Sequence, residues 1–351
     1  MNQTVREIAH PLKQITAGQL LAMNFPPREF AIDPWLRTGE SAMIWAASGV
    51  GKTWLTLSLA LAMAGGGKVA GWSSPKPRKV LVIDGEMNTQ DLQDRTRYLL
   101  DTGAVRDIDR AALMRNLVFM PRQAQDPEAM FYDITDEGSQ RRIMKRMAEN
   151  DAEVVIVDNL TTCADGLDDE NDATAFREVM KFLLMMKQGG KTAILVHHAR
   201  KDGSDARGST AIEATFEVKL GLHKPKVSRP DVASFITHFG KKRTKGDDST
   251  SNPKVWTLTD FGWTVEDVEG VVDNRVVEAL KSLEYVNQSE LAGALGITQG
   301  AVSKALKKAA ELGQPKKEEI DRLFTAARKL RLEEADPFED PDTDADAEEP
   351  F

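Results

Sequence analysis

The feature that most constrains the fold is a glycine-containing loop, AASGVGKTW at residues 46–54, set between two apolar segments. The segment before it, SAMIWAA at 41–47, is an apolar run of strand length. The segment after it, TWLTLSLALAMA at 53–64, has the length of a helix and ends at three consecutive glycines. A strand, a glycine turn and a helix N-terminus in this order can cradle an anion. The sequence therefore predicts a phosphate-binding loop here.

The loop AASGVGKT fits the phosphate-loop pattern, with Ala46 at the first glycine position. Glycines let backbone N–H groups turn toward phosphate oxygens, a lysine adds a positive charge, and a threonine hydroxyl can bind Mg²⁺. An ordinary glycine-rich turn is the alternative, but the flanking strand and helix are the context that a nucleotide site requires. We predict ATP and Mg²⁺ as ligands of Ala47, Ser48, Gly49, Val50, Gly51, Lys52 and Thr53.

Apolar strands and helices alternate after this loop, which predicts an α/β fold with a mainly parallel sheet covered on both faces. The later predicted strands have no helices between them, which indicates an antiparallel edge. The strands are expected at 79–86, 153–159, 192–199, 215–222, 234–243 and 255–265, and the helices at 91–101 and 175–190.

Four regions follow from changes in composition. Residues 1–30 form an N-terminal arm with one short helix, TAGQLLAM, and residues 31–268 form the α/β domain. Residues 269–334 read as three short helices and a fourth. Residues 335–351 form an acidic tail that we expect to be disordered. The fourth helix is expected to present one apolar face made of Ile320, Leu323, Phe324, Ala327 and Leu330.

Composition excludes little about the partners of this chain. The formal net charge is −9, but the last twenty residues hold ten acids and no Lys or Arg, so the remaining charges nearly balance and do not argue against nucleic acid. The single cysteine, Cys163, allows no internal disulfide and fits a reducing compartment. The longest apolar run, 55–64, is about half of what a membrane helix needs. We expect a cytoplasmic protein with no membrane partner.

Carboxylates follow two of the predicted strands. Asp158 ends the run EVVIVD, where a carboxylate beside a phosphate loop can hold Mg²⁺-bound water. Asp84 and Glu86 follow VLVI, and hydrolysis needs a carboxylate near the terminal phosphate to polarise water. These two share one side if the strand continues past them. Glu86 is the candidate base, Asp84 the second choice, and a solvated strand end the alternative.

A histidine pair, His197 and His198, ends the fourth predicted strand and faces the same crevice. One of the two can report the state of the terminal phosphate to neighbouring loops. A histidine that is simply hydrogen-bonded at a strand end is the alternative.

The order of these pieces resembles the RepA-type, RecA-like ATPases of plasmids and mobile elements, over about residues 15–265. The pieces are the phosphate loop, DGEM, VVIVDNL, LVHHARK, RGST and KKR. The resemblance implies a RecA-like P-loop core and a homo-oligomeric ring, expected to be a hexamer, with ATP between neighbouring subunits. It implies Lys52 and Thr53 on phosphate and Mg²⁺, Glu86 as catalytic base, Asp158 on the metal and His198 as sensor.

The resemblance also implies cationic residues that reach the site of an adjacent subunit. Arg207 in ARGSTA matches the finger position of the family, and Lys241 and Arg243 match a Lys-x-Arg pair of related ring helicases. From the residues alone each is an exposed loop charge. Arg200 and Lys201 make the loop at 199–206 the better candidate to contact single-stranded DNA than the acidic loop at 161–174. Neither loop has an aromatic residue on which a base can stack.

The C-terminal helices depart from that family. QSELAGALGITQGAVSKALKKA is similar to the helix-turn-helix of bacterial regulators, with the turn at Gly296. This similarity implies contacts of the third helix with duplex DNA, and helices that only pack together are the alternative. The candidate DNA-binding residues are Thr298, Gln299, Ser303 and Lys304 on the side that would face the groove, with Lys307 and Lys308 near phosphates.

The acidic tail ends at Phe351. It looks like the tips of single-stranded-DNA-binding proteins and of some phage replication proteins, which dock a terminal Phe in an apolar pocket of a replication partner. A tail that only increases solubility is the alternative.

Taken together, the sequence predicts an ATP-dependent DNA replication motor, a ring-forming helicase of a mobile element or phage. One alternative is an ATPase that loads or remodels another replication protein. A second is a DNA-binding regulator that ATP switches.

Overall fold

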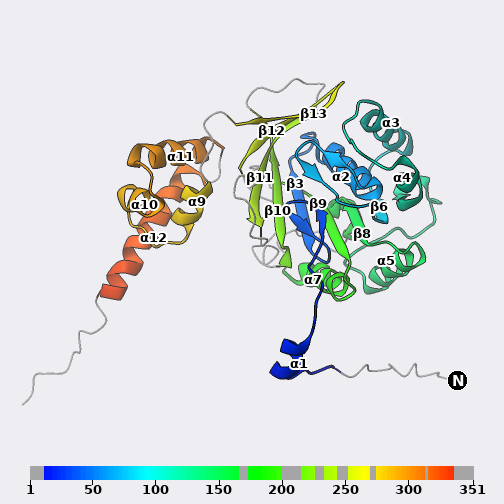
Figure 1. Ribbon diagram of the computed structural model, residues 1–351, viewed down its shortest axis with the longest axis horizontal. Helices are drawn as coiled ribbons and strands as arrows, with labels where there is room; N and C mark the ends of the chain where they lie inside the picture. Colours follow the sequence, from blue (N-terminus) through cyan, green and yellow to red (C-terminus); the bar gives the residue numbers. More distant parts are fainter. Residues whose placement is uncertain are drawn as a thin grey trace, which may run out of the picture.

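A computed structural model describes residues 12–165, 173–199, 215–225, 233–242, 252–268, 274–312 and 315–335 (Figure 1). A central nine-stranded sheet has the order β13-β12-β11-β10-β3-β9-β8-β6-β7. Its strands are β3 (Ser41–Ala46), β6 (Val80–Asp84), β7 (Leu117–Pro121), β8 (Val154–Asp158), β9 (Thr192–His198), β10 (Val218–His223), β11 (Ser234–Lys242), β12 (Lys254–Thr259) and β13 (Gly262–Asp267).

The sheet is parallel from β10 through β3, β9, β8 and β6 to β7, and antiparallel from β10 to β13. The predicted α/β fold, with a mainly parallel sheet and an antiparallel edge, is confirmed. The predicted single strand at 255–265 is wrong, because β12 and β13 form a hairpin. Gly262 lies in that turn with φ of 88°, a left-handed conformation that suits glycine.

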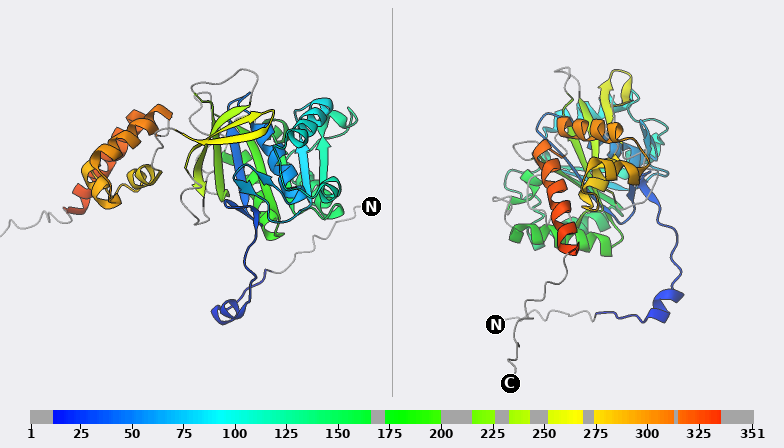
Figure 2. Two further views of the ribbon diagram at one scale, coloured as in Figure 1. Left: turned by 45° about the horizontal axis from the view of Figure 1, so that its top comes forward. Right: turned by 90° about the vertical axis from the view of Figure 1, so that its left-hand side faces the viewer.

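Helices cover both faces of the sheet, as the figures show (Figures 1 and 2). The helices of this domain are α2 (Lys52–Gly65), α3 (Thr89–Asp101), α4 (Arg110–Asn116), α5 (Glu137–Glu149), α6 (Leu160–Cys163) and α7 (Ala173–Gln188), with the short η1 (Arg122–Ala124). α2 contributes Leu55, Leu57 and Leu59 to the core on one face, and α7 contributes Phe176 and Phe182 to the core on the other. α2 is buried along most of its length, which explains its uninterrupted apolar sequence.

Several helices and strands of the α/β domain were not predicted from the sequence. α5 is mostly polar and buries only a narrow stripe, and β7 is a partly exposed edge strand after the short α4. Two small hairpins, β1 (Phe30–Ile32) with β2 (Leu36–Arg37) and β4 (Lys68–Val69) with β5 (Trp72–Ser73), lie outside the main sheet. Such short elements lack the periodicity by which a strand or helix is recognised.

The helical segment expected after the α/β domain is present, and its four helices share an apolar core. They are α9 (Asn274–Lys281), α10 (Gln288–Leu295), α11 (Gln299–Leu312) and α12 (Lys317–Ala335). The core includes Val276, Leu291, Val302 and Phe324. On the predicted apolar face of α12, Ile320, Phe324 and Ala327 are buried, whereas Leu330 is 44% exposed.

The N-terminal arm carries α1 (Ala17–Ala22), the helix expected there, and Figure 1 shows it held away from the sheet. Among the described residues, no helix has the length and apolar character needed to cross a membrane.

Candidate nucleotide-binding site

The phosphate loop connects the carboxyl end of β3 to the first residue of α2. Gly49 and Gly51 have φ of 76° and 118°, a region that residues with a side chain rarely adopt. A Cβ on Gly51 would lie 3.2 Å from the Phe235 ring and 3.3 Å from Ala233, so β11 closes the space behind the loop. Gly51 caps α2 without a side-chain hydrogen bond, so in this described segment the first N–H groups of α2 are open to an anion.

Lys52 lies at the floor of this cradle and is only 7% exposed. Its Nζ donates to the carbonyl oxygens of Ala46 at 3.0 Å and Ala47 at 3.2 Å, and lies 3.3 Å from Nδ1 of His198. Burial lowers the pKa of Lys52, and the nearby Asp158 and Glu86 carboxylates partly oppose that shift. The fold therefore holds one ammonium group where phosphate oxygens are expected.

Asp158 ends β8, two strands from the phosphate loop across the sheet, and is 6% exposed. Its Oδ2 accepts a hydrogen bond from Thr56 Oγ1 at 3.3 Å. Burial and the neighbouring Asp84 raise the pKa of Asp158 to about 7, while Thr53 and Lys52 act in the opposite direction. A threonine hydroxyl and a buried carboxylate facing it are hard oxygen donors that suit Mg²⁺, so the residues present fit Mg²⁺-ATP.

The structure distinguishes the two carboxylates that follow β6. The expectation that the strand continues is wrong, because β6 ends at Asp84 and the chain turns there. Asp84 is 2% exposed, and its Oδ1 accepts from the backbone N–H groups of Glu86 at 3.0 Å and Met87 at 2.7 Å. Asp84 therefore closes the turn. Glu86 is exposed, lines the pocket and accepts a hydrogen bond from Asn159 Nδ2.

His198 also reaches the phosphate loop. Its Nδ1 lies 3.4 Å from Ser48 Oγ in addition to the contact with Lys52. β9 pairs with β3 in parallel, with Ala46 opposite His198, so the two strand ends meet at this edge. His197 is 2% exposed, so of this pair only His198 lines the pocket.

The resulting pocket has a volume of about 530 Å³. Sequence reasoning missed several residues that line or support it, namely Trp54, Arg95, Thr56 and Asn159. The Arg95 guanidinium lies 5.0 Å from the Trp54 ring, and Trp54 meets Tyr98 edge to face at 5.6 Å. Asn159 follows Asp158 directly, so its place beside the predicted Mg²⁺ carboxylate could have been predicted from the sequence. No local sequence pattern marks Arg95 on α3 as a pocket residue.

Other predicted residues lie elsewhere. Lys241 pairs with Lys219 near the start of β10, whereas the phosphate loop is at the opposite end of the sheet, so Lys241 does not join the site of its own chain. Gln299, Ser303, Lys304 and Lys307 are exposed on α11. Arg200, Lys201, Arg207, Arg243 and Phe351 lie outside the described residues.

Comparison with protein families matches residues 6–204 to a family described as an AAA domain. No curated protein matches the sequence. Among solved structures, a KaiC-like protein from the hyperthermophilic archaeon Pyrococcus horikoshii is similar, with 13% sequence identity and a TM-score of 0.46. The match covers 67% of this chain and 93% of that one.

Proposed function

The chain belongs to the AAA domain family of P-loop ATPases, and from this premise we propose that it hydrolyses ATP to drive movement on DNA, as a ring-forming helicase of the RepA type. The ring is expected to be a hexamer that acts in the replication of a mobile element or phage. The observation that carries the ATPase part is the convergence of Lys52, Thr53, Asp158 and Glu86 on one pocket.

Each residue has a distinct part in this proposal. Lys52 and the first N–H groups of α2 bind the phosphates, and Thr53 and Asp158 hold Mg²⁺, which neutralises phosphate charge when bound. Glu86 accepts a proton from the attacking water, and Asn159 orients its carboxylate. His198 touches Lys52 and Ser48, which suits a group that senses the terminal phosphate.

The cationic groups expected in trans belong to the same proposal. Arg207, Lys241 and Arg243 act on the pocket of an adjacent subunit, since positive charge at the transferred phosphate accelerates hydrolysis. The position of Lys241 far from its own phosphate loop supports a role in trans.

The DNA part is supported by α11. Its N-terminal residues follow the tight turn at Gly296, where φ is 65°, and its exposed face carries Lys304 and Lys307 beside Gln299 and Ser303. We propose that this face contacts duplex DNA, that Arg200 and Lys201 contact a single strand, and that Phe351 docks on a replication partner.

The test is ATP hydrolysis with and without single-stranded DNA, with a forked duplex present to report strand separation. Lys52→Ala is the inactive variant, and Lys68→Ala, a lysine 58% exposed on β4, is the matched control. Stimulated hydrolysis with unwinding, lost only in Lys52→Ala, supports the helicase. Hydrolysis without unwinding favours a loader of another replication protein, and tight duplex binding with little turnover favours an ATP-switched regulator.

A further inference from the structure

Asn159 is a buried residue of the nucleotide pocket with one unused hydrogen-bonding atom. It is 1% exposed and follows Asp158 at the end of β8. Its Nδ2 donates to Glu86 Oε2, and this orientation of the amide is fixed because a carboxylate accepts and does not donate. The other amide atom, Oδ1, is buried and has no hydrogen-bond partner among the described residues. A buried acceptor without a partner is costly, so an arrangement that pairs Oδ1 competes with this one.

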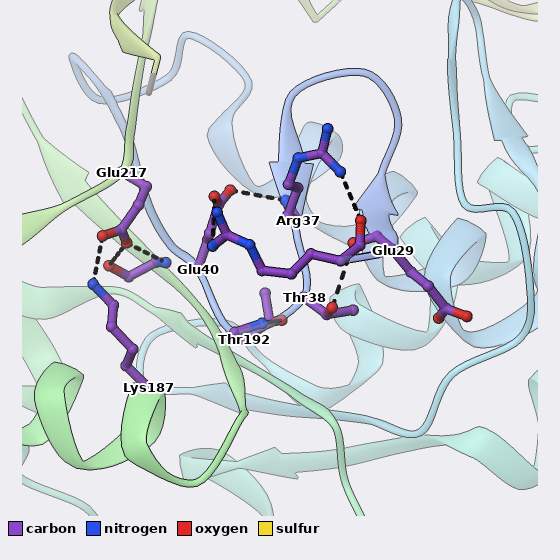
Figure 3. A network of polar contacts seen from close by, with 10 residues as sticks. Glu29, Arg37, Thr38, Glu40, Lys187, Thr192 and Glu217 are labelled. Atoms are coloured by element: carbon purple, nitrogen blue, oxygen red, sulfur yellow. Dashed lines mark hydrogen bonds and ion pairs between the residues drawn. The ribbon is translucent and has the colours of Figure 1, made fainter. Parts of the chain in front are cut away.

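Buried polar groups at the opposite end of the sheet are paired (Figure 3). Glu40 accepts from a backbone N–H at 2.9 Å. Glu217 accepts from Ser41 N at 2.9 Å and from the Lys187 ammonium group. Within the described lining of the nucleotide pocket, Asn159 is the residue that carries a buried side-chain atom without a partner. The unpaired atom therefore lies beside the expected chemistry.

Asn159 also occupies the N-cap position of α6, yet its side chain does not cap that helix. Its backbone is extended, with φ of −129° and ψ of 174°, as an N-cap residue requires. The first N–H groups of a helix have no partner within it, and asparagine is among the best residues to accept from them. In this structure the amide bonds to Glu86 and not to α6, so capping requires the side chain to rotate away from Glu86.

α6 lies directly against the turn that carries Glu86. A Cβ on Gly85 would overlap Thr162 Oγ1 and would lie 2.8 Å from Cys163 Sγ, so this close approach needs glycine. On its other side α6 is held by Arg122, whose Nη1 donates to the Thr162 carbonyl at 3.1 Å. A change at the N-terminus of α6 therefore reaches Glu86 by direct contact.

We propose that the Asn159 amide exchanges between two positions, one on Glu86 and one on the N-terminus of α6. In the first position, seen here, the bond that orients the Glu86 carboxylate also restrains it. In the second position Oδ1 caps α6, and Glu86 is free to approach the attacking water. Asn159 is a positioning residue in this scheme, because it acts on ATP only through Glu86.

This inference rests on the proposed function, in which Glu86 is the base and single-stranded DNA stimulates hydrolysis. It adds the group that couples the two. A ligand that binds better to the form with a capped α6 shifts Asn159 toward the second position and so accelerates hydrolysis.

The first experiment measures steady-state ATP hydrolysis by full-length Asn159→Ser, with and without single-stranded DNA. Serine is a good N-cap, but its hydroxyl is one bond closer to the backbone than the amide nitrogen and does not reach Glu86. We expect kcat without DNA to rise about fivefold or more, with KM for ATP within about twofold, and DNA stimulation to fall correspondingly. An unchanged or lower basal kcat overturns the proposal, because a residue that only orients the base can only lose activity.

Two further variants complete this experiment. Asn159→Ala also removes the restraint but cannot cap α6, so it should raise basal kcat and melt at a lower temperature than Asn159→Ser. The matched control is Asn287→Ser, at the N-cap of α10, where the native side chain does cap its helix by accepting from Glu290 N at 2.9 Å. Its basal kcat should stay within about twofold of the wild type.

A double variant tests the route through the base. Asn159→Ser/Glu86→Gln should be as inactive as Glu86→Gln alone, because the gain consists only of releasing Glu86. A gain that survives Glu86→Gln overturns the proposal.

A structure of the wild type decides the matter even where a variant fails to fold. The protein is crystallised with a non-hydrolysable ATP analogue, Mg²⁺ and a single-stranded oligonucleotide. We expect Asn159 Oδ1 within hydrogen-bond distance of an N–H group of α6. An amide that still donates to Glu86 beside an uncapped α6 overturns the proposal.

These outcomes are separate from those of the proposed function. DNA-stimulated hydrolysis that is equal in Asn159→Ser and in the wild type removes the exchange and leaves the motor. A wild type without DNA stimulation contradicts the motor, while a higher basal kcat in Asn159→Ser that depends on Glu86 still supports the exchange.

Discussion

The nucleotide pocket and the exposed face of α11 carry the two sets of polar residues on which the proposed function depends, and they are built in opposite ways. In the pocket, Lys52, Asp84 and Asp158 are 7%, 2% and 6% exposed, and they act on one another. On α11, Lys304 and Lys307 project from a helical unit whose core is apolar. Buried charges interact strongly and depend on every neighbour, whereas exposed charges are screened by salt and act nearly independently.

This contrast predicts that single changes in the pocket have large effects and that changes on α11 have small, additive ones. The largest effect is expected for Lys52→Ala, which removes the ammonium group at the floor of the cradle. We expect kcat/KM for ATP to fall by about 10³-fold. Duplex DNA binding, measured by fluorescence anisotropy, should stay within about twofold of the wild type because α11 belongs to a separate core. Loss of both ATP hydrolysis and duplex DNA binding in Lys52→Ala would contradict the independence of the pocket and α11.

Substitutions of Glu86 and Asp84 should have different effects, the first on catalysis and the second on stability. Glu86→Gln is expected to lower kcat by about 10²-fold or more at nearly constant KM and unchanged melting temperature, since it removes only the proton acceptor. Asp84→Ala is expected to lower the free energy of unfolding by about 1–3 kcal/mol, because it removes the Oδ1 that accepts the backbone N–H groups of Glu86 and Met87. Steady-state kinetics and thermal denaturation of both variants check this assignment. The reverse pattern would make Asp84 the base.

Asp158→Asn should trade activity for stability. Burial opposes the charged form of Asp158, so a neutral amide in its place is expected to raise the free energy of unfolding at pH 8, without nucleotide or Mg²⁺, by about 1 kcal/mol or more. The same variant should lose hydrolysis because it loses a metal-binding carboxylate. Differential scanning calorimetry in the presence of a chelator measures the first effect. A lower melting temperature would show that hydrogen bonding to Thr56 outweighs desolvation.

On α11, Lys304→Ala and Lys307→Ala should each weaken duplex DNA binding by less than about tenfold. Lys307→Ala should also reduce the slope of log affinity against log salt by about 1, because Lys307 is proposed to lie near a phosphate, whereas Lys304 is proposed to face the groove. Lys317→Ala, an exposed lysine on α12, is the matched control. Titrations at several salt concentrations measure the slope. Slopes equal to that of the wild type would leave α11 as a packing helix.

The smallest effect is expected for an exposed pair that links α12 to α10. Arg331 donates to Glu290 at 2.9 Å and holds the pKa of Glu290 below its usual value. A lowered pKa stabilises the fold above the unfolded value of about 4.5, and this contribution is lost as the pH falls through the folded value. The difference in stability between wild type and Arg331→Ala should therefore shrink as the pH falls below the unfolded value and through the lowered folded value. Circular dichroism melts at pH 7 and pH 3 compare the two proteins.

The sequence predicted the strongly patterned part of the fold. β3, α2, β6, β8 and β9 follow from long apolar runs, and the phosphate loop follows from its glycines and Lys52. It did not predict α5, β7 or the β12–β13 hairpin, because their segments are short or mostly polar and owe their structure to packing against the sheet.

What the sequence determined by itself is which residues are available for phosphate chemistry, because the loop and the strand ends are local patterns that need no distant partner. Only the tertiary structure decided which of those residues has a structural role and which can act on the nucleotide. Asp84 and Glu86 are two residues apart, yet one is buried under backbone N–H groups and the other is exposed beside Asn159 from β8. Burial and hydrogen-bond partners come from strands that lie side by side only after folding, so no local pattern could assign them.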